Sequence, residues 1–263
     1  MKPNQKFMLL TAVLLAMMFV SATDYPDFNK DFRKFDRNLY ASRHEVTNKE
    51  YREFLLALKS SSQKDQYLSC LYDSSQWVIK FPSSYNEPMK DNYHSHCCYD
   101  LYPVVNITPE AAKAYCEWLT RRYDGSSRKK FKKVLFRLPS EEEWIKLAAP
   151  MPGQDLPWNG NLPYMDNKNK TILANINNNS MASGKMKTGC NEGLYTMITE
   201  HYKPNTLGFY DVIGNVSEMT LEGNQKGGSW DNVLEECKVD KVQKYSLPDP
   251  RVGFRVIMEI IEE

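Results

Sequence analysis

Three stretches of the chain repeat apolar residues at helical spacing, and a polar cap precedes each of them. In the first stretch, Thr47 and Glu50 form a capping box, and the apolar positions that follow at i, i+3, i+4 and i+7 are Tyr51, Phe54, Leu55 and Leu58. This pattern predicts a helix that ends near Lys59.

The other two stretches carry similar signals. Thr108 caps a second helix, which is expected to end near Arg122. Ser140 and Glu143 form another capping box in front of a short helix that Pro150 ends. The positions predicted to face the core from these two helices are Ala112, Tyr115, Cys116, Leu119, Trp144, Leu147 and Ala148.

Extended segments are few and short. We expect them at residues 39–43, 134–137, 208–211 and 252–259. Residues 151–194 are rich in Asn, Gly, Pro and Lys and follow neither period, which indicates a long surface loop whose backbone needs side chains, a ligand or a metal to hold it. These patterns predict an α+β fold with about three helices, a few short strands and long ordered loops.

The composition is that of a folded domain. The chain has 263 residues, of which 41% are hydrophobic and 25% charged, so neither a disordered chain nor a disulfide mini-protein is expected. Lys and Arg number 34 against 33 Asp and Glu, and the formal net charge is +1. Without an excess of positive charge to attract phosphates, nucleic acid is not an expected partner.

The beginning of the chain has the features of a secretory leader. Lys2 and Lys6 precede an apolar run over residues 8–20, and small residues follow at Ser21 and Ala22. A membrane anchor is the alternative, but a helix over this run would span only about 20 Å, short of the roughly 30 Å hydrocarbon core. We therefore predict a signal peptide over residues 1–22, cleavage near Ala22, and a secreted, periplasmic or outer-membrane-associated protein without a transmembrane span in its mature chain.

Six cysteines are compatible with disulfides in such a compartment. An even count permits up to three bonds in fifteen arrangements, and the sequence does not choose among them. Cys116 lies on the apolar face of a predicted helix, where we expect a buried free thiol at least as readily as a disulfide bond. Adjacent thiols do not easily bond to each other. The disulfide candidates are Cys70, Cys97, Cys98, Cys190 and Cys237, with Cys190–Cys237 as one suggested pair.

Six motifs, in order along the chain, resemble the formylglycine-generating-enzyme-like (sulfatase-modifying-factor) domain, whose core is similar to the C-type lectin fold. The resemblance implies a domain over residues 39–263, preceded by an N-terminal extension over residues 23–38. The motifs are residues 40–54 (YASRHEVTNKEYREF), 102–119 (YPVVNITPEAAKAYCEWL), 136–144 (FRLPSEEEW), 207–218 (LGFYDVIGNVSE), 226–230 (KGGSW) and 253–256 (GFRV).

A narrower resemblance precedes the second motif. Residues 71–77, 85–89 (YNEPM) and 93–105 (YHSHCCYDLYPVV) are similar to the branch found in bacterial gliding-motility and type 9 secretion lipoproteins. In that branch the domain is understood as a structural part of an envelope complex. Those proteins carry a lipid-anchor cysteine, whereas no cysteine follows the apolar run here, and they are usually longer.

Catalytic members of the family hold Cu(I) through two cysteines in a pattern like G-G-S-[FW]-x-C-x-x-x-x-C and oxidise a substrate cysteine to formylglycine. Counted from Gly227, the first cysteine position is Asn232 and the second is Cys237. A neutral amide does not replace a thiolate on soft Cu(I). The resemblance therefore implies that copper is not a cofactor and that there is no catalytic residue of this type. Under the alternative, a copper-dependent oxidase, Cys237 is the catalytic residue.

The resemblance also implies calcium, which lectin-like folds use to hold long loops and which prefers hard oxygen ligands. The matching candidates are the side chains of Asn175 and Glu218, the carbonyls of Ile176 and Val216, and Asn215. The alternative for the two asparagines is that each bonds its own backbone.

One other cluster has metal-ligand character. His94 and His96 precede Cys97 and Cys98, and if this segment were a strand both imidazoles would lie on one face. The spacing is loose, and the interpretation that we favour is a packing loop rich in Tyr and His.

These observations favour an exported, non-catalytic scaffold or binding protein of the bacterial cell envelope, with components of an envelope protein complex as its partners. The alternatives are the copper-dependent oxidase that matures sulfatases and a ligand-binding, lectin-like module.

Overall fold

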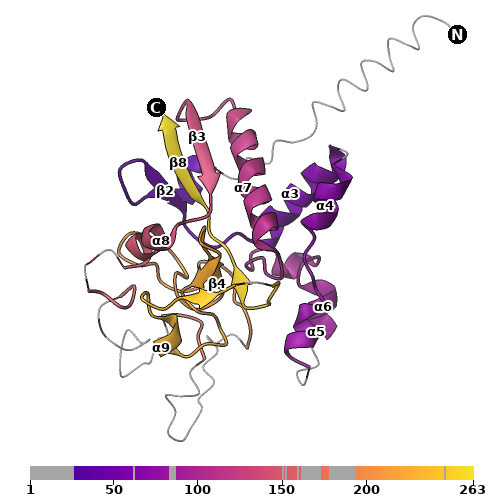
Figure 1. The fold of residues 1–263 in the computed structure, drawn as a ribbon, viewed down its shortest axis with the longest axis vertical. Coiled ribbons are helices and arrows are strands. Elements are labelled where there is room, and N and C mark those ends of the chain that lie inside the picture. Colours follow the sequence, from indigo (N-terminus) through magenta and orange to yellow (C-terminus); the bar gives the residue numbers. More distant parts are fainter. Residues whose placement is uncertain are drawn as a thin grey trace, which may run out of the picture.

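The computed structural model describes residues 27–61, 63–82, 87–149, 151, 153–158, 160, 173–177, 194–245 and 247–263 (Figure 1). The predicted signal peptide and Cys190 lie outside the described residues, as does most of the predicted loop over residues 151–194. The described part of the chain contains no helix with the length and apolar composition of a membrane span.

The three helices predicted from their caps are present as α3 (Asn48–Ser60), α7 (Pro109–Asp124) and α8 (Glu141–Ala148). Both capping boxes form with their two reciprocal hydrogen bonds, and the Thr108 hydroxyl accepts a hydrogen bond from the backbone N–H of Ala111. These predictions are confirmed. They succeed because a capping box and an apolar stripe are local signals, which do not depend on the rest of the fold.

Several shorter helices were not predicted. Each spans three to six residues, fewer than two turns, so none of them displays a readable apolar period. The estimate of about three helices therefore covers only the three long ones. The additional elements are α2 (Phe28–Asp31), α4 (Lys64–Ser69), α5 (Gln76–Lys80), α6 (Glu87–Asn92), the 3-10 turn η1 (Cys97–Tyr99) and α9 (Leu234–Cys237).

The first sheet joins the two ends of the described chain. Its strand order is β1-β2-β8-β3, with every neighbouring pair antiparallel. β1 falls within the segment expected as an N-terminal extension over residues 23–38, and its pairing with β2 places residues 32–34 in the sheet. The bounds are β1 (Phe32–Lys34), β2 (Leu39–Ser42), β8 (Ile257–Glu262) and β3 (Lys133–Arg137).

The second sheet is smaller, with the order β6-β5-β4-β7 and a parallel pairing of β4 with β7. The strand expected at residues 208–211 is wrong, because Gly208 and Asp211 have φ of 87° and 52°, which no β-strand allows. The single strand expected over residues 252–259 is divided between β7 and β8, and the break contains Arg255. The bounds are β6 (Gln243–Lys244), β5 (Asn224–Lys226), β4 (Ser217–Met219) and β7 (Val252–Gly253).

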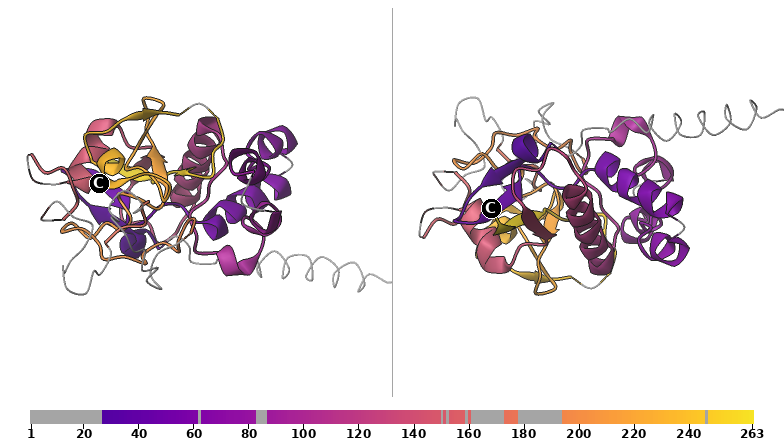
Figure 2. Two further views of the ribbon diagram at one scale, coloured as in Figure 1. Left: turned by 90° about the horizontal axis from the view of Figure 1, so that it is seen from below. Right: turned by 90° about the horizontal axis from the view of Figure 1, so that it is seen from above.

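Three apolar clusters hold these elements together. One joins α3 and α7 to the first sheet through stacked and edge-on rings such as Tyr51, Tyr115 and Phe254. A second surrounds Trp144 of α8, and a third surrounds Trp77. Figure 2 shows α7 between the two sheets and the layer formed by α3 to α6. This arrangement leaves the loop that follows β5 packed beside α9.

Candidate functional site

The turn after β5 occupies the position of the family's copper motif. Gly227 and Gly228 have φ of 85° and 64°, in the region that favours glycine. A Cβ on Gly228 would lie 2.4 Å from Sγ of Cys237, and a Cβ on Gly227 would lie 2.6 Å from the carbonyl oxygen of Val212. The two glycines therefore allow the turn to lie directly against the thiol.

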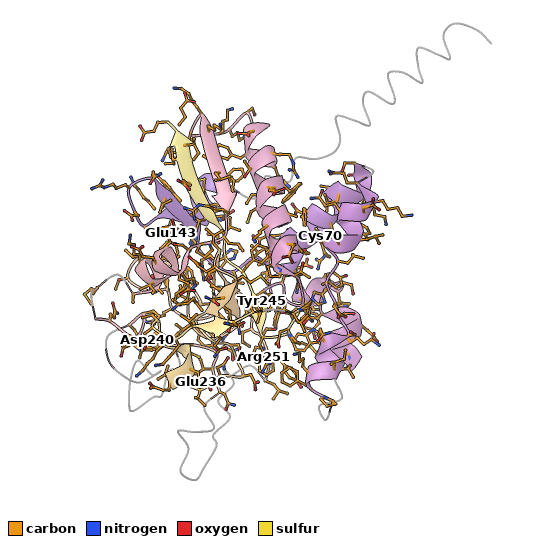
Figure 3. The ribbon with its side chains drawn as sticks, viewed as in Figure 1. Cys70, Glu143, Glu236, Asp240, Tyr245 and Arg251 are labelled. Atoms are coloured by element: carbon orange, nitrogen blue, oxygen red, sulfur yellow. The ribbon has the colours of Figure 1, made fainter. Side chains whose placement is uncertain are left out.

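Asn232, which stands at the first cysteine position, has a structural role. Its Oδ1 accepts hydrogen bonds from the backbone N–H of Ser229 at 3.0 Å and from the Ser229 hydroxyl at 2.8 Å. Its Nδ2 donates to Oε2 of Glu236 at 3.0 Å, and Figure 3 labels this glutamate on α9. The amide thus closes the turn and connects it to the next helix, with both of its polar atoms engaged.

Cys237, at the second position, is fully buried. Burial raises the pKa of its thiol to about 12, so the group is a neutral thiol near pH 7. Cu(I) bound by two thiolates requires two soft anionic ligands, and this position offers a hydrogen-bonded amide and a neutral thiol. The residues present do not fit that copper centre.

The five described cysteines are all free, with Cys97 and Cys98 exposed and Cys70, Cys116 and Cys237 buried. The free, buried thiol considered for Cys116 is present. The suggested Cys190–Cys237 bond stays a prediction, because Cys190 lies outside the described residues.

Thiol exposure predicts the order of chemical modification. Under brief iodoacetamide treatment of the reduced, folded protein, we expect Cys97 and Cys98 to be alkylated and Cys70, Cys116 and Cys237 to be protected, because burial both blocks access and raises the pKa of those three thiols. Peptide mass mapping reports each site. Unfolding in denaturant should make all five react. Rapid alkylation of Cys237 in the folded protein would contradict its burial.

A buried ion pair lies beside this turn. Glu218 and Arg255 are both fully buried, with Oε1 and Nη2 at 2.6 Å. Trp144 donates its indole N–H to Oε2 of Glu218 at 2.8 Å. Arg255 also donates to the carbonyl oxygens of Ser42 and Tyr210 at 2.9 and 2.7 Å. The pair therefore connects β2, β4, α8 and the loop at residue 210.

Two further carboxylates lie close to this pair. Glu45 is fully buried; its Oε1 accepts from Nδ2 of Asn215 at 3.0 Å, and its Oε2 has no hydrogen-bond partner among the described residues. Asp211 is nearly buried and accepts from the backbone N–H of Glu200 at 2.8 Å. Burial raises the pKa of Glu45, and burial raises the pKa of Asp211 to about 7. Three carboxyl groups thus surround one guanidinium.

The calcium candidates are brought together in part. The backbone N–H of Asn215 donates to the carbonyl of Asn175 at 2.8 Å, and Ile176 and Val216 are buried nearby. The amide of Asn175 donates to the carbonyl of Tyr195 at 2.7 Å, and Oδ1 of Asn215 accepts from the N–H of Met197 at 2.8 Å. These amides bond other segments rather than their own backbone. Glu218 faces Arg255, and calcium binding stays a prediction.

Glu45 and Asp211 were not predicted as site residues, although both lie inside family motifs, at residues 40–54 and 207–218. Glu45 precedes the Thr47 cap and is identical in type to many surface glutamates, so its burial depends on contacts with residue 215 and with the chain around residue 255.

The histidine motif divides between two environments. His94 is buried, stacks on Tyr72 with ring centroids 3.9 Å apart, and donates from Nε2 to the carbonyl of Val105 at 3.0 Å. His96 is exposed at the start of η1. The packing interpretation is confirmed for His94. The strand geometry that would have placed both imidazoles on one face is wrong.

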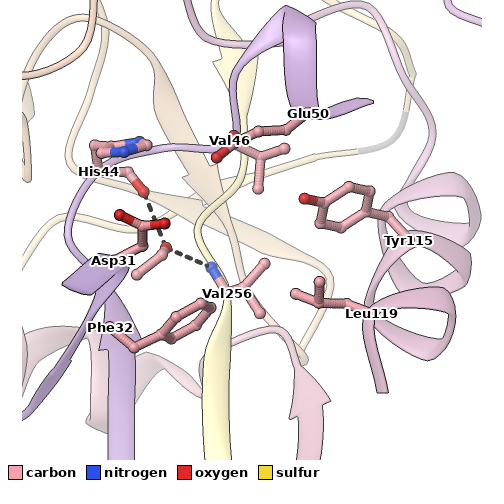
Figure 4. Close-up of a pocket in the computed structure, with 9 residues that line it drawn as sticks. Asp31, Phe32, His44, Val46, Glu50, Tyr115, Leu119 and Val256 are labelled. Carbon is pink, nitrogen blue, oxygen red and sulfur yellow. Dashed lines mark hydrogen bonds between the residues drawn. The ribbon is translucent and has the colours of Figure 1, made fainter. Parts of the chain in front are cut away.

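Two cavities differ greatly in size. Figure 4 shows the smaller one, where Glu50 of α3, Tyr115 of α7 and Phe32 of β1 face one another. At its edge the Ser42 hydroxyl donates a hydrogen bond to the carbonyl of His44 and accepts one from the N–H of Val256. Its volume is about 10 Å³, the scale of a single water. The larger cavity measures about 250 Å³, and its lining includes Trp158, Lys203, Phe209 and Asp211.

The fold and the glycine turn together define a formylglycine-generating-enzyme-like domain. The chain belongs to this family: it matches the Sulfatase-modifying factor enzyme 1-like domain over residues 29–260. The resemblance expected from six short motifs is thereby confirmed.

Two mammalian relatives are similar in sequence. The Bos taurus protein "Inactive C-alpha-formylglycine-generating enzyme 2" is 27% identical over 143 residues, which are 49% of this chain and 38% of the bovine protein. The Mus musculus protein of the same name is 25% identical over 211 residues, which are 72% of this chain and 59% of the mouse protein. The chain thus spans less than two thirds of the length of either relative.

Two solved structures share the fold. The crystal structure of CarF matches with a TM-score of 0.53 at 18% identity and covers 84% of this chain and 86% of CarF. Treponema denticola variable protein 1 matches with a TM-score of 0.51 at 18% identity and covers 87% of this chain and 91% of that protein. The predicted α+β fold class is confirmed.

Proposed function

We propose that this protein is a non-catalytic member of the family that acts by binding other proteins in a bacterial cell envelope. The observation that carries the proposal is the state of the two positions that would hold copper. Asn232 uses its amide to close a turn, and Cys237 is a buried, neutral thiol. The word "inactive" in the names of the two mammalian relatives agrees with this assignment.

The oxidase alternative is tested by peptide oxidation. The reduced protein is loaded with Cu(I) and incubated with a cysteine-containing peptide, and oxygen uptake and peptide mass are followed. We expect no formylglycine. Since Cys97 and Cys98 are exposed thiols that also attract copper, the assay is repeated in a Cys97→Ser/Cys98→Ser variant. Formylglycine production that disappears in Cys237→Ala and persists in the serine variant would overturn the proposal.

The envelope assignment includes export after cleavage near Ala22 and a relationship to gliding-motility and type 9 secretion components. It is supported by the sequence resemblance over residues 71–105. Residues of that segment, among them Trp77, Tyr93 and Tyr102, form one aromatic cluster with Trp230 of the glycine turn. The segment therefore belongs to the same packed unit as the family motif and is suited to a structural role.

A pull-down tests the partners. The full chain, tagged at its C-terminus and expressed in its native cell, is captured from detergent-treated envelopes and from the soluble fraction, and the proteins recovered are identified by mass spectrometry. We expect secretion or motility components, in equal yield with Cys237→Ala. The oxidase would be favoured instead if the wild-type protein recovers a sulfatase or another cysteine-bearing substrate protein and the Cys237→Ala variant does not.

Calcium is part of the proposal as a structural ion. Three buried carboxyl groups against one guanidinium leave excess negative charge in an apolar interior, which must be neutralised by protons or by a cation. The partnerless Oε2 of Glu45 fits a hard cation, with Asp211 as the second charged oxygen ligand. Asn175, Ile176, Asn215, Val216 and Glu218 remain the ligand candidates taken from the sequence.

The pKa directions give this proposal a pH signature. Without a cation, the folded state loses stability as the pH rises from the ordinary aspartate pKa of 3.8 through about 7, because the raised pKa of Asp211 belongs to the folded state alone. We therefore expect Ca²⁺ to raise the melting temperature more at pH 8 than at pH 5, where it competes with protons. Glu45→Gln should remove the effect, and Glu117→Gln on the exposed face of α7 should keep it. Equal shifts in both variants would contradict the site.

A second candidate function rests on the cavity of about 250 Å³, which combines the indole of Trp158 with the charged groups of Lys203 and Asp211. A cavity with apolar walls and a few polar groups suits a small polar ligand such as a sugar. Binding on a glycan array that is lost in Lys203→Ala would support a ligand-binding, lectin-like module. Absence of binding on the array would count against it.

A further inference from the structure

Three consecutive exposed residues at η1 carry one imidazole and two thiols. The ligand atoms of His96, Cys97 and Cys98 all lie within 4.8 Å of one another. We propose that these side chains form a surface site for a thiophilic d¹⁰ cation, Zn²⁺ or Cu⁺, separate from both the glycine turn and the carboxylate cluster.

The geometry of the turn suits such an ion. Nδ1 of His96 accepts a hydrogen bond from the backbone N–H of Cys98 at 3.2 Å, so the imidazole lies against the turn that carries the thiols, and an ion bound at Nδ1 would replace this hydrogen bond. Ligands of a tetrahedral zinc ion lie about 3.5 Å from one another, as follows from bond lengths near 2.0–2.3 Å. Atoms already within 4.8 Å need only small side-chain rotations to reach this separation.

The backbone that carries the three ligands is fixed to the beginning of α3. Nδ2 of Asn48 donates to the carbonyls of Tyr93 and Tyr99 at 3.0 and 3.1 Å, on either side of the turn. The N–H of Lys49 donates to the carbonyl of Asp100, and Nη1 of Arg52 donates to the carbonyl of His94 at 3.0 Å. A turn held at both ends loses little conformational freedom when it binds an ion, which favours affinity.

The three side chains do not contribute to the core. His94, two residues earlier, is buried and stacked, and the other described cysteines are buried, whereas His96, Cys97 and Cys98 are all exposed. Cysteine is among the most frequently buried residue types, so two adjacent exposed thiols beside an imidazole are explained better by ligand chemistry than by packing.

The donor set selects the ion. The nearest acidic side chain in sequence, Asp100, is paired with Arg52 and does not add a hard oxygen ligand. One nitrogen and two sulfurs favour Zn²⁺ or Cu⁺ over Ca²⁺ or Mg²⁺. Three protein ligands leave the fourth position of a tetrahedral zinc ion for water or for a group from a partner.

The test measures metal binding by the full-length, reduced protein under anaerobic conditions. Zn²⁺ affinity is measured by competition with a chromophoric chelator, Cu⁺ affinity by competition with a Cu⁺-specific chelator, and Co²⁺ serves as a probe whose sulfur-to-metal charge-transfer absorption reports thiolate ligation. We expect one site, weakened by about a hundredfold or more in Cys97→Ser/Cys98→Ser and by about tenfold in His96→Gln. Each affinity, compared with the free concentration of that ion in the protein's compartment, indicates which of the two occupies the site.

The matched control is His201→Gln, which removes another exposed histidine and should leave the affinity unchanged. Cys190 is retained in every variant, so differences among them report on the turn alone. Three results would each overturn the proposal. They are an unchanged affinity in the double serine variant, a Co²⁺ spectrum without the charge-transfer band, and a Cys97–Cys98 disulfide that remains after treatment with reductant.

Discussion

Replacing Arg255 with Leu is expected to lower the free energy of unfolding by about 3–5 kcal/mol, because it leaves Glu218 buried without its counter-charge. The same change removes the hydrogen bonds to the carbonyls of Ser42 and Tyr210. Loss of these bonds together with the ion pair to Glu218 should loosen the junction between β2, β4 and the loop at residue 210. Urea unfolding followed by circular dichroism measures the change.

The charge explanation is separable from simple loss of packing. Burial raises the pKa of both Glu45 and Asp211, so these two carboxyl groups carry less negative charge at pH 5, and the destabilisation by Arg255→Leu should be smaller there than at pH 8. Arg255→Lys, which keeps the charge, should lose less than Leu. Arg121→Leu, which breaks an exposed pair with Glu117, should change stability by at most about 0.5 kcal/mol. A loss that does not vary with pH would point to packing alone.

What the sequence predicted correctly was local. The boxes at Thr47 and Ser140 are complete within four residues, and both form as expected. The short helices α5 and α6 lacked such a signal, since segments of five or six residues depend on tertiary packing, here of Trp77 and Met89 in one aromatic cluster, rather than on their own period.

What the sequence did not predict depends on contacts between distant residues. Nothing near Glu45 in the sequence indicates burial, and its environment is created by Asn215 and by Arg255, about two hundred residues further along the chain. The prediction of a strand at residues 208–211 was wrong for a related reason. The backbone has positive φ at Gly208 and Asp211, and in this conformation the Asp211 carboxylate accepts a hydrogen bond from the N–H of Glu200, a distant contact. The family resemblance located the glycine motif in the sequence. The cluster of Glu45, Asp211, Glu218 and Arg255 became visible only in the folded structure.

Replacing Gly228 with Ala is expected to lower the free energy of unfolding by about 2–4 kcal/mol, through backbone strain and overpacking together. Gly228 has φ of 64°, and its added Cβ would meet Sγ of Cys237 at 2.4 Å and the Cα at 3.0 Å. Neither group can withdraw easily, because Cys237 is fully buried beneath the turn. Denaturant unfolding measures the loss.

A second glycine separates the two causes. Gly223 has φ of 80°, and an added Cβ there meets nothing within 4 Å, so Gly223→Ala reports strain alone, about 1–2 kcal/mol. The excess loss at Gly228 then measures the conflict with Cys237, and Cys237→Ala in the Gly228→Ala background should restore part of it. If Gly228→Ala costs no more than Gly223→Ala, the space above the thiol is open. A metal or substrate could then reach Cys237, and the case against catalysis at this position would lose its structural basis.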